Sequence, residues 1–123
     1  MKQLLLIFIG GGFGSTLRYV IGIQLNSSDS GFPWGTMFSN VCGSLLIGII
    51  LGFAAKNNTL SANQTLLLVT GFCGGFTTFS TFGMESYRLM ETGYLVTAIF
   101  YMIGSVIASI FGIWLSQFLT KQI

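Results

Sequence analysis

The residues best suited to chemistry stand together in one run, Gly71-Phe72-Cys73-Gly74-Gly75-Phe76-Thr77-Thr78-Phe79-Ser80-Thr81-Phe82. Glycine costs about 1 kcal/mol relative to alanine inside a helix, and threonine side chains compete for backbone hydrogen bonds, so the run predicts a broken helix. It lies within an apolar segment otherwise long enough to cross a bilayer, where freed backbone groups must find partners other than lipid. We interpret the break either as an ion or substrate site or as a packing kink, and its hydroxyls and phenyl rings favour the site.

The elements around this run are predicted from composition and length. The chain has 123 residues, of which 52% are apolar and 7% are charged, and its mean hydropathy is +0.80. A soluble domain carries about 25% charged residues, so the chain is predicted to be an integral membrane protein. Because one span takes about 20 residues, we expect an all-α fold of one domain, residues 1–123. Its four transmembrane helices are expected at about residues 4–25, 36–55, 64–90 and 94–119, joined by short loops.

The same composition argues against several classes of protein. We expect no extramembrane domain, and therefore no enzyme. The sequence contains no histidine, which excludes a histidine-based metal site or proton relay. The net charge of +2 is small and scattered, so no nucleic acid partner is expected.

The first two predicted spans each contain one polar residue that is a candidate for a functional role, Arg18 and Asn40. Four residues recur every four positions and so share one face of the first helix: Gly10, Gly14, Arg18 and Gly22. The glycines allow a neighbouring backbone to approach closely. Arg18 either extends to the headgroups or faces a wet vestibule, where it would attract anions. Asn40 in the second span is either a hydrogen-bonding contact between helices or a pore-lining group.

The third and fourth spans add aromatic, charged and hydroxyl side chains. Phe79 and Phe82 lie three residues apart beside the break, where they either face lipid or line a site. Glu85 and Arg88 have the same spacing and are expected to form an ion pair, which lowers the cost of both charges. A ridge on the fourth span carries hydroxyls at a spacing of four: Tyr101, Ser105 and Ser109. Such a ridge is either packing or a polar track.

These side chains suit an anion better than a cation. The membrane interior offers mostly neutral donors, with the positive edges of phenyl rings beside them. The one carboxylate in a span lies near an arginine, whereas cation pathways show acidic rings. The carbonyls freed at the break are acceptors and suit a small cation held in place. The residues therefore predict a small-anion pathway with a structural cation at the broken helix.

The distribution of basic residues predicts insertion in both orientations. Lys2, Lys56 and Lys121 fall on one side of a four-span chain, and Arg88 falls on the other, joined by Arg18 if it reaches that way. This difference is a weak positive-inside signal. Four glycine-rich helices also have little interior of their own. We therefore expect an antiparallel dimer in the lipid bilayer.

Three stretches together resemble the Fluc (CrcB) family of bacterial fluoride channels. They are Gly11-Gly12-Phe13-Gly14 with Arg18-Tyr19; Gly35-Thr36 with Asn40 and Gly43; and the third-span run with Glu85. The resemblance covers nearly the whole chain. It implies a fluoride-selective channel for passive F⁻ export, multi-pass in the bacterial inner (cell) membrane. It further implies an antiparallel dual-topology homodimer with two pores and a structural, non-transported Na⁺ at its centre.

The resemblance also assigns residues. The main-chain carbonyls of Gly74 and Thr77 would hold Na⁺, and Arg18 would sit in or near an aqueous vestibule. The fluoride pore would be lined by the remaining polar and aromatic candidates: Asn40, Thr78, Phe79, Ser80, Phe82, Tyr101, Ser105 and Ser109. The alternative is a small dual-topology exporter of drugs or metabolites. That class needs a titrating acid in an early span, and the first two spans have none.

Overall fold

Four helical segments make up the part of the chain that the structure describes. Its structure, a computed structural model, describes residues 1–26, 31–57 and 60–122. Three segments are single helices: α1 Lys2–Leu25, α2 Trp34–Asn57 and α6 Leu95–Gln122. The remaining segment is divided into α3 Ala62–Thr65, the π-helical η1 Leu66–Cys73, α4 Gly74–Phe76 and α5 Phe79–Glu91.

All four segments are long and apolar enough to cross a membrane, so the protein is a multi-pass membrane protein. The prediction of four helical spans is confirmed, and the helices extend a few residues beyond the predicted limits at most ends. The predicted loops fall partly on residues 27–30 and 58–59, which lie outside the described residues.

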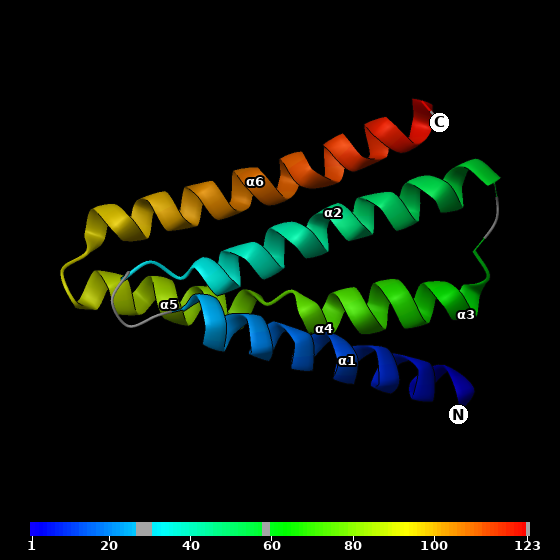
Figure 1. Cartoon of the computed structure of the whole chain (residues 1–123), viewed down its shortest axis with the longest axis horizontal. Helices are drawn as coiled ribbons and strands as arrows, with labels where there is room; N and C mark the ends of the chain where they lie inside the picture. Colours follow the sequence, from blue (N-terminus) through cyan, green and yellow to red (C-terminus); the bar gives the residue numbers. More distant parts are fainter. Residues whose placement is uncertain (27–30, 58–59, 123) are drawn as a thin grey trace.

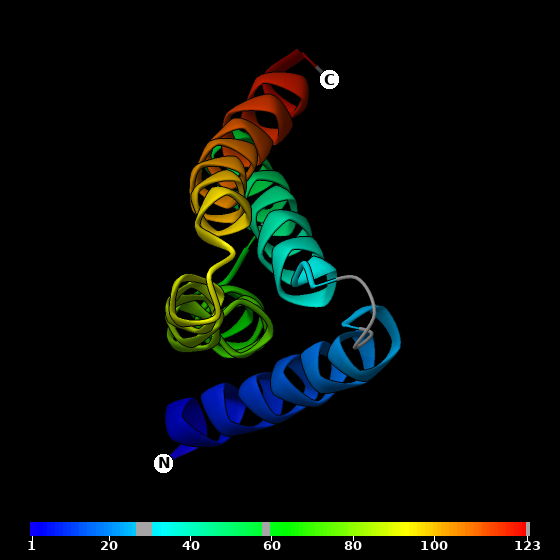
Figure 2. The same ribbon diagram turned by 90° about the vertical axis from the view of Figure 1, so that its left-hand side faces the viewer.

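The segments pack in two pairs. α2 runs along α6, and α1 runs along η1 and α4 (Figures 1 and 2). The amino and carboxyl termini lie at the same end of the bundle, as an even number of spans requires (Figure 1). Large apolar side chains such as Phe8, Phe100 and Trp114 face outward, as expected for surfaces in contact with lipid.

Glycines bring the backbone of α1 against the third segment. A Cβ added to Gly10 would lie 2.8 Å from the Phe72 nitrogen, and one added to Gly14 would lie 2.7 Å from the Phe76 nitrogen. A Cβ on Gly75 would lie 2.9 Å from the Gly11 Cα. Close packing is therefore confirmed for Gly10 and Gly14 of the predicted face, whereas a Cβ on Gly22 would meet no atom within 4 Å. The two packed glycines fix α1 directly against the part of the third segment that precedes Thr77.

A second glycine contact joins α2 to α6. A Cβ on Gly48 would lie 2.7 Å from the Ile113 carbonyl oxygen, and one on Gly52 would lie 2.8 Å from the Thr120 Cβ. The turn between α5 and α6 also needs a glycine, because Gly93 adopts φ 87, a conformation that disfavours other residues. The glycine contacts place α6 directly beside α2.

Candidate ion pathway

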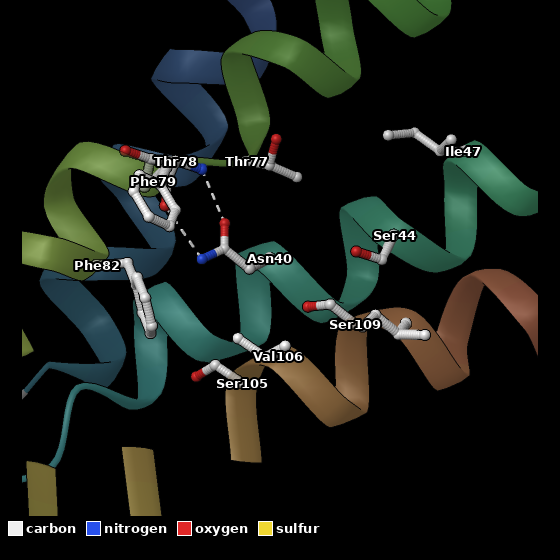
Figure 3. Close-up of a pocket in the computed structure, with 11 residues that line it drawn as sticks. Asn40, Ser44, Ile47, Thr77, Thr78, Phe79, Phe82, Ser105, Val106 and Ser109 are labelled. Atoms are coloured by element: carbon white, nitrogen blue, oxygen red, sulfur yellow. Dashed lines mark hydrogen bonds between the residues drawn. The ribbon is translucent and has the colours of Figure 1, made fainter. Parts of the chain in front are cut away.

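The third segment changes conformation between α4 and α5. Thr77 has φ −83 and ψ 155, and Thr78 has φ −151 and ψ 125, so both residues are extended. We call Thr77–Thr78 the extended link. The Thr78 N–H donates to Asn40 Oδ1 at 2.8 Å, and Asn40 Nδ2 donates to the Thr78 carbonyl at 3.2 Å (Figure 3). The Asn40 side chain thus pairs with the backbone of the link as a second strand would.

Two carbonyls at the extended link lose the donors that a continuous helix would give them. In a continuous helix the Gly74 carbonyl would accept from the Thr78 N–H, which here goes to Asn40. The Thr77 carbonyl would accept from the Thr81 N–H, which instead donates to Thr78 Oγ1 at 3.2 Å. Within the described residues the structure gives neither carbonyl a hydrogen bond. The two oxygens for which the sequence resemblance implies a sodium ion are thus available as ligands.

The extended link is also supported from its other sides. Thr78 caps α5 through the bond to Thr81, as is usual for threonine at a helix N-terminus. Arg18 Nε on α1 donates to the Gly75 carbonyl at 3.2 Å, so a fixed positive charge lies close to the end of α4. Gly43 on α2 has no room for a side chain, because the Thr77 methyl group lies against it.

A cavity of about 310 Å³ opens between the extended link, α2, α5 and α6 (Figure 3). We call it the link pocket. Most of the predicted pore residues line it: Asn40, Thr78, Phe79, Phe82, Ser105 and Ser109. The rest of the lining consists of Thr77 and Ser44 with the aliphatic side chains of Ile47, Val106 and Ile110. The pocket therefore combines hydroxyls, one amide and two phenyl rings with an otherwise apolar wall.

The two phenyl rings lie at one end of the link pocket, with centroids 5.7 Å apart and planes tilted by 42°. Phe79 is 83% exposed, although it is a large apolar side chain, and Phe82 is half-buried. Phe82 also packs on Tyr101, at a centroid distance of 5.1 Å. Most of the Phe79 ring is therefore accessible at the surface of the chain.

Tyr101 lies behind the link pocket and is not part of its lining. It is fully buried, and its hydroxyl donates to Glu85 Oε2 at 2.7 Å. The other carboxylate oxygen accepts from Thr36 Oγ1 at 2.8 Å and from Asn26 Nδ2 at 3.4 Å. One carboxylate therefore links α5 to α6, to α2 and to the end of α1.

The expected ion pair between Glu85 and Arg88 is not formed in the described part of the chain. Thr36 and Tyr101 take the strongest contacts of the carboxylate because they lie on the helices that α5 packs against. Arg88 instead lies in the last turn of α5, exposed, where a positive charge complements the helix dipole. Spacing along one helix could not reveal these partners on other helices.

The last two predicted site residues lie elsewhere. Ser80 is exposed, and its hydroxyl lies 3.3 Å from that of Thr78, outside the link pocket lining. Arg18 lines a separate cavity of about 320 Å³ together with Tyr19, Asn26, Thr36 and Thr81. This second cavity carries the charge, whereas the link pocket is lined by uncharged groups.

Comparison with known proteins gives the same family as the sequence motifs. Residues 5–117 match the family described as "CrcB-like protein, Camphor Resistance (CrcB)". The chain belongs to this family. A relative from Phocaeicola vulgatus, named "Fluoride-specific ion channel FluC", is 43% identical over 122 residues, covering 95% of this chain and all of the relative. A Nitrobacter winogradskyi protein of the same name is 46% identical over 108 residues, covering 87% of this chain and 86% of the relative.

Family membership confirms the resemblance drawn from the motifs, and it places the chain among proteins named as ion channels, which are not enzymes. Motif reasoning missed three residues that the structure brings to these sites. Ser44 lies four residues after Asn40, a helical spacing that the sequence already contained. Asn26 and Thr36 give no such signal, because their partner Glu85 is distant in the sequence.

Proposed function

We propose that this chain is a fluoride channel that lets F⁻ leave the cell passively across the bacterial inner (cell) membrane. The observation that carries the proposal is the link pocket, where uncharged donors and phenyl rings converge at the interruption of a membrane-spanning segment. The names of the relatives support fluoride as the ion. HF crosses membranes and dissociates inside, so a passive exit for F⁻ lowers internal fluoride when the outside is acidic.

The chemistry of the link pocket fits a small anion. Fluoride is strongly hydrated, so several donors must converge to replace its water. The Asn40 amide carries two hydrogens; one holds the Thr78 carbonyl, which leaves the second for an ion. The Ser105 hydroxyl is buried and has no partner in the described residues. Phe79 and Phe82 add ring edges, which carry partial positive charge.

Arg18 contributes at a distance in this proposal. Its cavity is separate from the link pocket, and its guanidinium is held by the Gly75 carbonyl. A fixed positive charge in a wet vestibule raises the local concentration of anions. Arg18 therefore attracts fluoride without binding it tightly in the dehydrated part of the path.

We infer that the functional unit is an antiparallel homodimer in which the third span is interrupted within the bilayer. Two features support the dimer: the 83% exposure of Phe79, and the exposed position of Gly74, the first residue of α4. A second protomer inserted in the opposite sense would cover both residues. The nearly balanced basic residues on the two sides allow such dual insertion.

The freed carbonyls of Gly74 and Thr77 fit a structural Na⁺. Main-chain carbonyl oxygens are hard ligands that suit a small hard cation, and two protomers would supply four of them. When bound, the ion would balance the partial negative charges of the freed carbonyl oxygens and join the two protomers. The protein's own part is carried by Asn40 and Thr78, which divert the N–H groups that would otherwise occupy these carbonyls.

Efflux from proteoliposomes tests the proposed function. Vesicles containing the purified protein should release fluoride rapidly and chloride at the rate of protein-free vesicles. Equal rates for both anions, or no fluoride release from protein shown to be folded, would refute the channel. Drug-dependent proton flux without fluoride flux would instead establish the exporter alternative.

Sodium is tested separately. Replacing Na⁺ with a bulky organic cation on both sides should weaken the dimer or its conduction. If dimer content and fluoride flux both stay unchanged after exhaustive exchange, the carbonyls of Gly74 and Thr77 hold no required ion.

A further inference from the structure

Several buried hydroxyl side chains donate to the backbone of their own helix, and others do not. Ser86, Ser116 and Thr120 donate to the carbonyl four residues earlier, at 2.7, 2.6 and 3.0 Å. This back-bond is the ordinary way in which a helix satisfies a buried hydroxyl. Ser44 and Ser105, although buried, make no such bond within the described residues. Both line the link pocket, so their hydroxyls remain available to a ligand there.

The position of Ser44 on α2 follows from its neighbours. Gly43 packs against Thr77 of the extended link, and Gly48 packs against Ser116 of α6. At 100° per residue, Ser44 falls on the strip of α2 between these two contacts, as does Asn40. Both residues accordingly line the link pocket, and Figure 3 shows the Ser44 hydroxyl directed toward the side of the pocket where Asn40 lies.

We propose that Ser44 is a further fluoride-contacting residue, which donates its hydroxyl to the ion one helical turn beyond Asn40. The four residues from Asn40 to Ser44 advance about 6 Å along α2, so the ion meets a second donor on the same helix as it leaves the first. Ser109 on α6 lines the same part of the pocket and also has no hydrogen bond in the described residues. Ser44 and Ser109 therefore offer donors to the ion from two different helices. This inference rests on the proposed function.

Missing back-bonds alone do not mark a donor for the ion. Ser39 is fully buried and also lacks a partner in the described residues, yet it is not part of the pocket lining. The inference for Ser44 depends on two features together: the unpaired hydroxyl and its place in the pocket wall. Ser44 is 8% exposed, which leaves it reachable from the pocket.

Fluoride efflux from proteoliposomes containing Ser44→Ala, Ser44→Thr or Ser116→Ala protein tests the inference. Removing the Ser44 hydroxyl should slow efflux about tenfold, the effect of losing one hydrogen bond to an ion, and raise the fluoride concentration that half-saturates it. Ser44→Thr keeps a hydroxyl and should conduct within about twofold of the unmodified protein. Ser116→Ala removes a back-bonded hydroxyl outside the link pocket and should leave both quantities unchanged.

The outcomes separate this inference from the proposed function. Rates are compared per dimer, counted by size-exclusion chromatography, so a loss of folded protein does not imitate a loss of conduction. If Ser44→Ala matches the unmodified protein in rate and half-saturation, or if Ser44→Thr loses as much as Ser44→Ala, Ser44 is not a donor. If the unmodified protein itself releases no fluoride, the proposed function fails instead.

Discussion

Replacing Asn40 by aspartate changes one amide group into a carboxylate of almost the same shape. The Thr78 N–H keeps its acceptor at 2.8 Å, but the donor to the Thr78 carbonyl at 3.2 Å is lost. Losing that bond costs about 1 kcal/mol of folding free energy. The larger effect falls on the ion, because a new negative charge about 4 Å away in surroundings of effective dielectric constant about 20 repels it by about 4 kcal/mol.

Fluoride efflux should therefore fall by about a thousandfold in Asn40→Asp, to the level of protein-free vesicles. A fluoride electrode outside the proteoliposomes records the release, and size-exclusion chromatography checks that the variant keeps the oligomeric state of the unmodified protein. The matched control is Asn63→Asp, which places the same charge on the exposed surface of α3, outside the link pocket. If Asn40→Asp conducts within about threefold of the control, Asn40 does not contact the permeating ion, and the hypothesis that the link pocket carries the ion is wrong.

Three further substitutions test the ring, the helix contact and the carboxylate. Phe79→Ile should slow fluoride efflux about tenfold without loss of dimer, because the exposed ring contributes a positive edge that isoleucine lacks. Gly14→Ala should lower the free energy of unfolding by about 1–3 kcal/mol through overpacking against η1 and α4, whereas Gly12→Ala, with open space around it, should not; thermal unfolding in detergent distinguishes them. Tyr101→Phe should cost about 1.5–3 kcal/mol, measured the same way, because Glu85 loses a hydrogen bond of 2.7 Å; an unchanged melting temperature would contradict this.

Local sequence patterns were enough for the spans, the close-packing glycines and most of the pocket lining. The spans follow from runs of apolar residues, and Gly10 and Gly14 pack as their spacing indicated. The change of conformation after α4 falls within the predicted run. Such features depend on residues that are close together in the sequence, so the sequence contains this information directly.

Contacts between helices were beyond the same reasoning. The Glu85 carboxylate has partners 16, 49 and 59 residues away in sequence, so the apparent pairing with Arg88 was wrong. Tyr101 shares a ridge with Ser105, yet Phe82 separates it from the pocket, because its ring packs on the Phe82 ring. The π-helical turns of η1 also had no signal in residue type that we could recognise.

The direct contact between glycine backbones has a consequence for the surrounding lipid. Gly11 and Gly75 are in direct backbone contact. At this contact no flexible side chain can adjust when α1 and α4 move relative to each other. A transmembrane helix adapts to a thinner or thicker bilayer by tilting. Tilting of α1 would therefore be transmitted to the carbonyls that follow Cys73. Conduction should depend on the acyl chain length of the lipid. This dependence should weaken if α1 has room to move relative to α4.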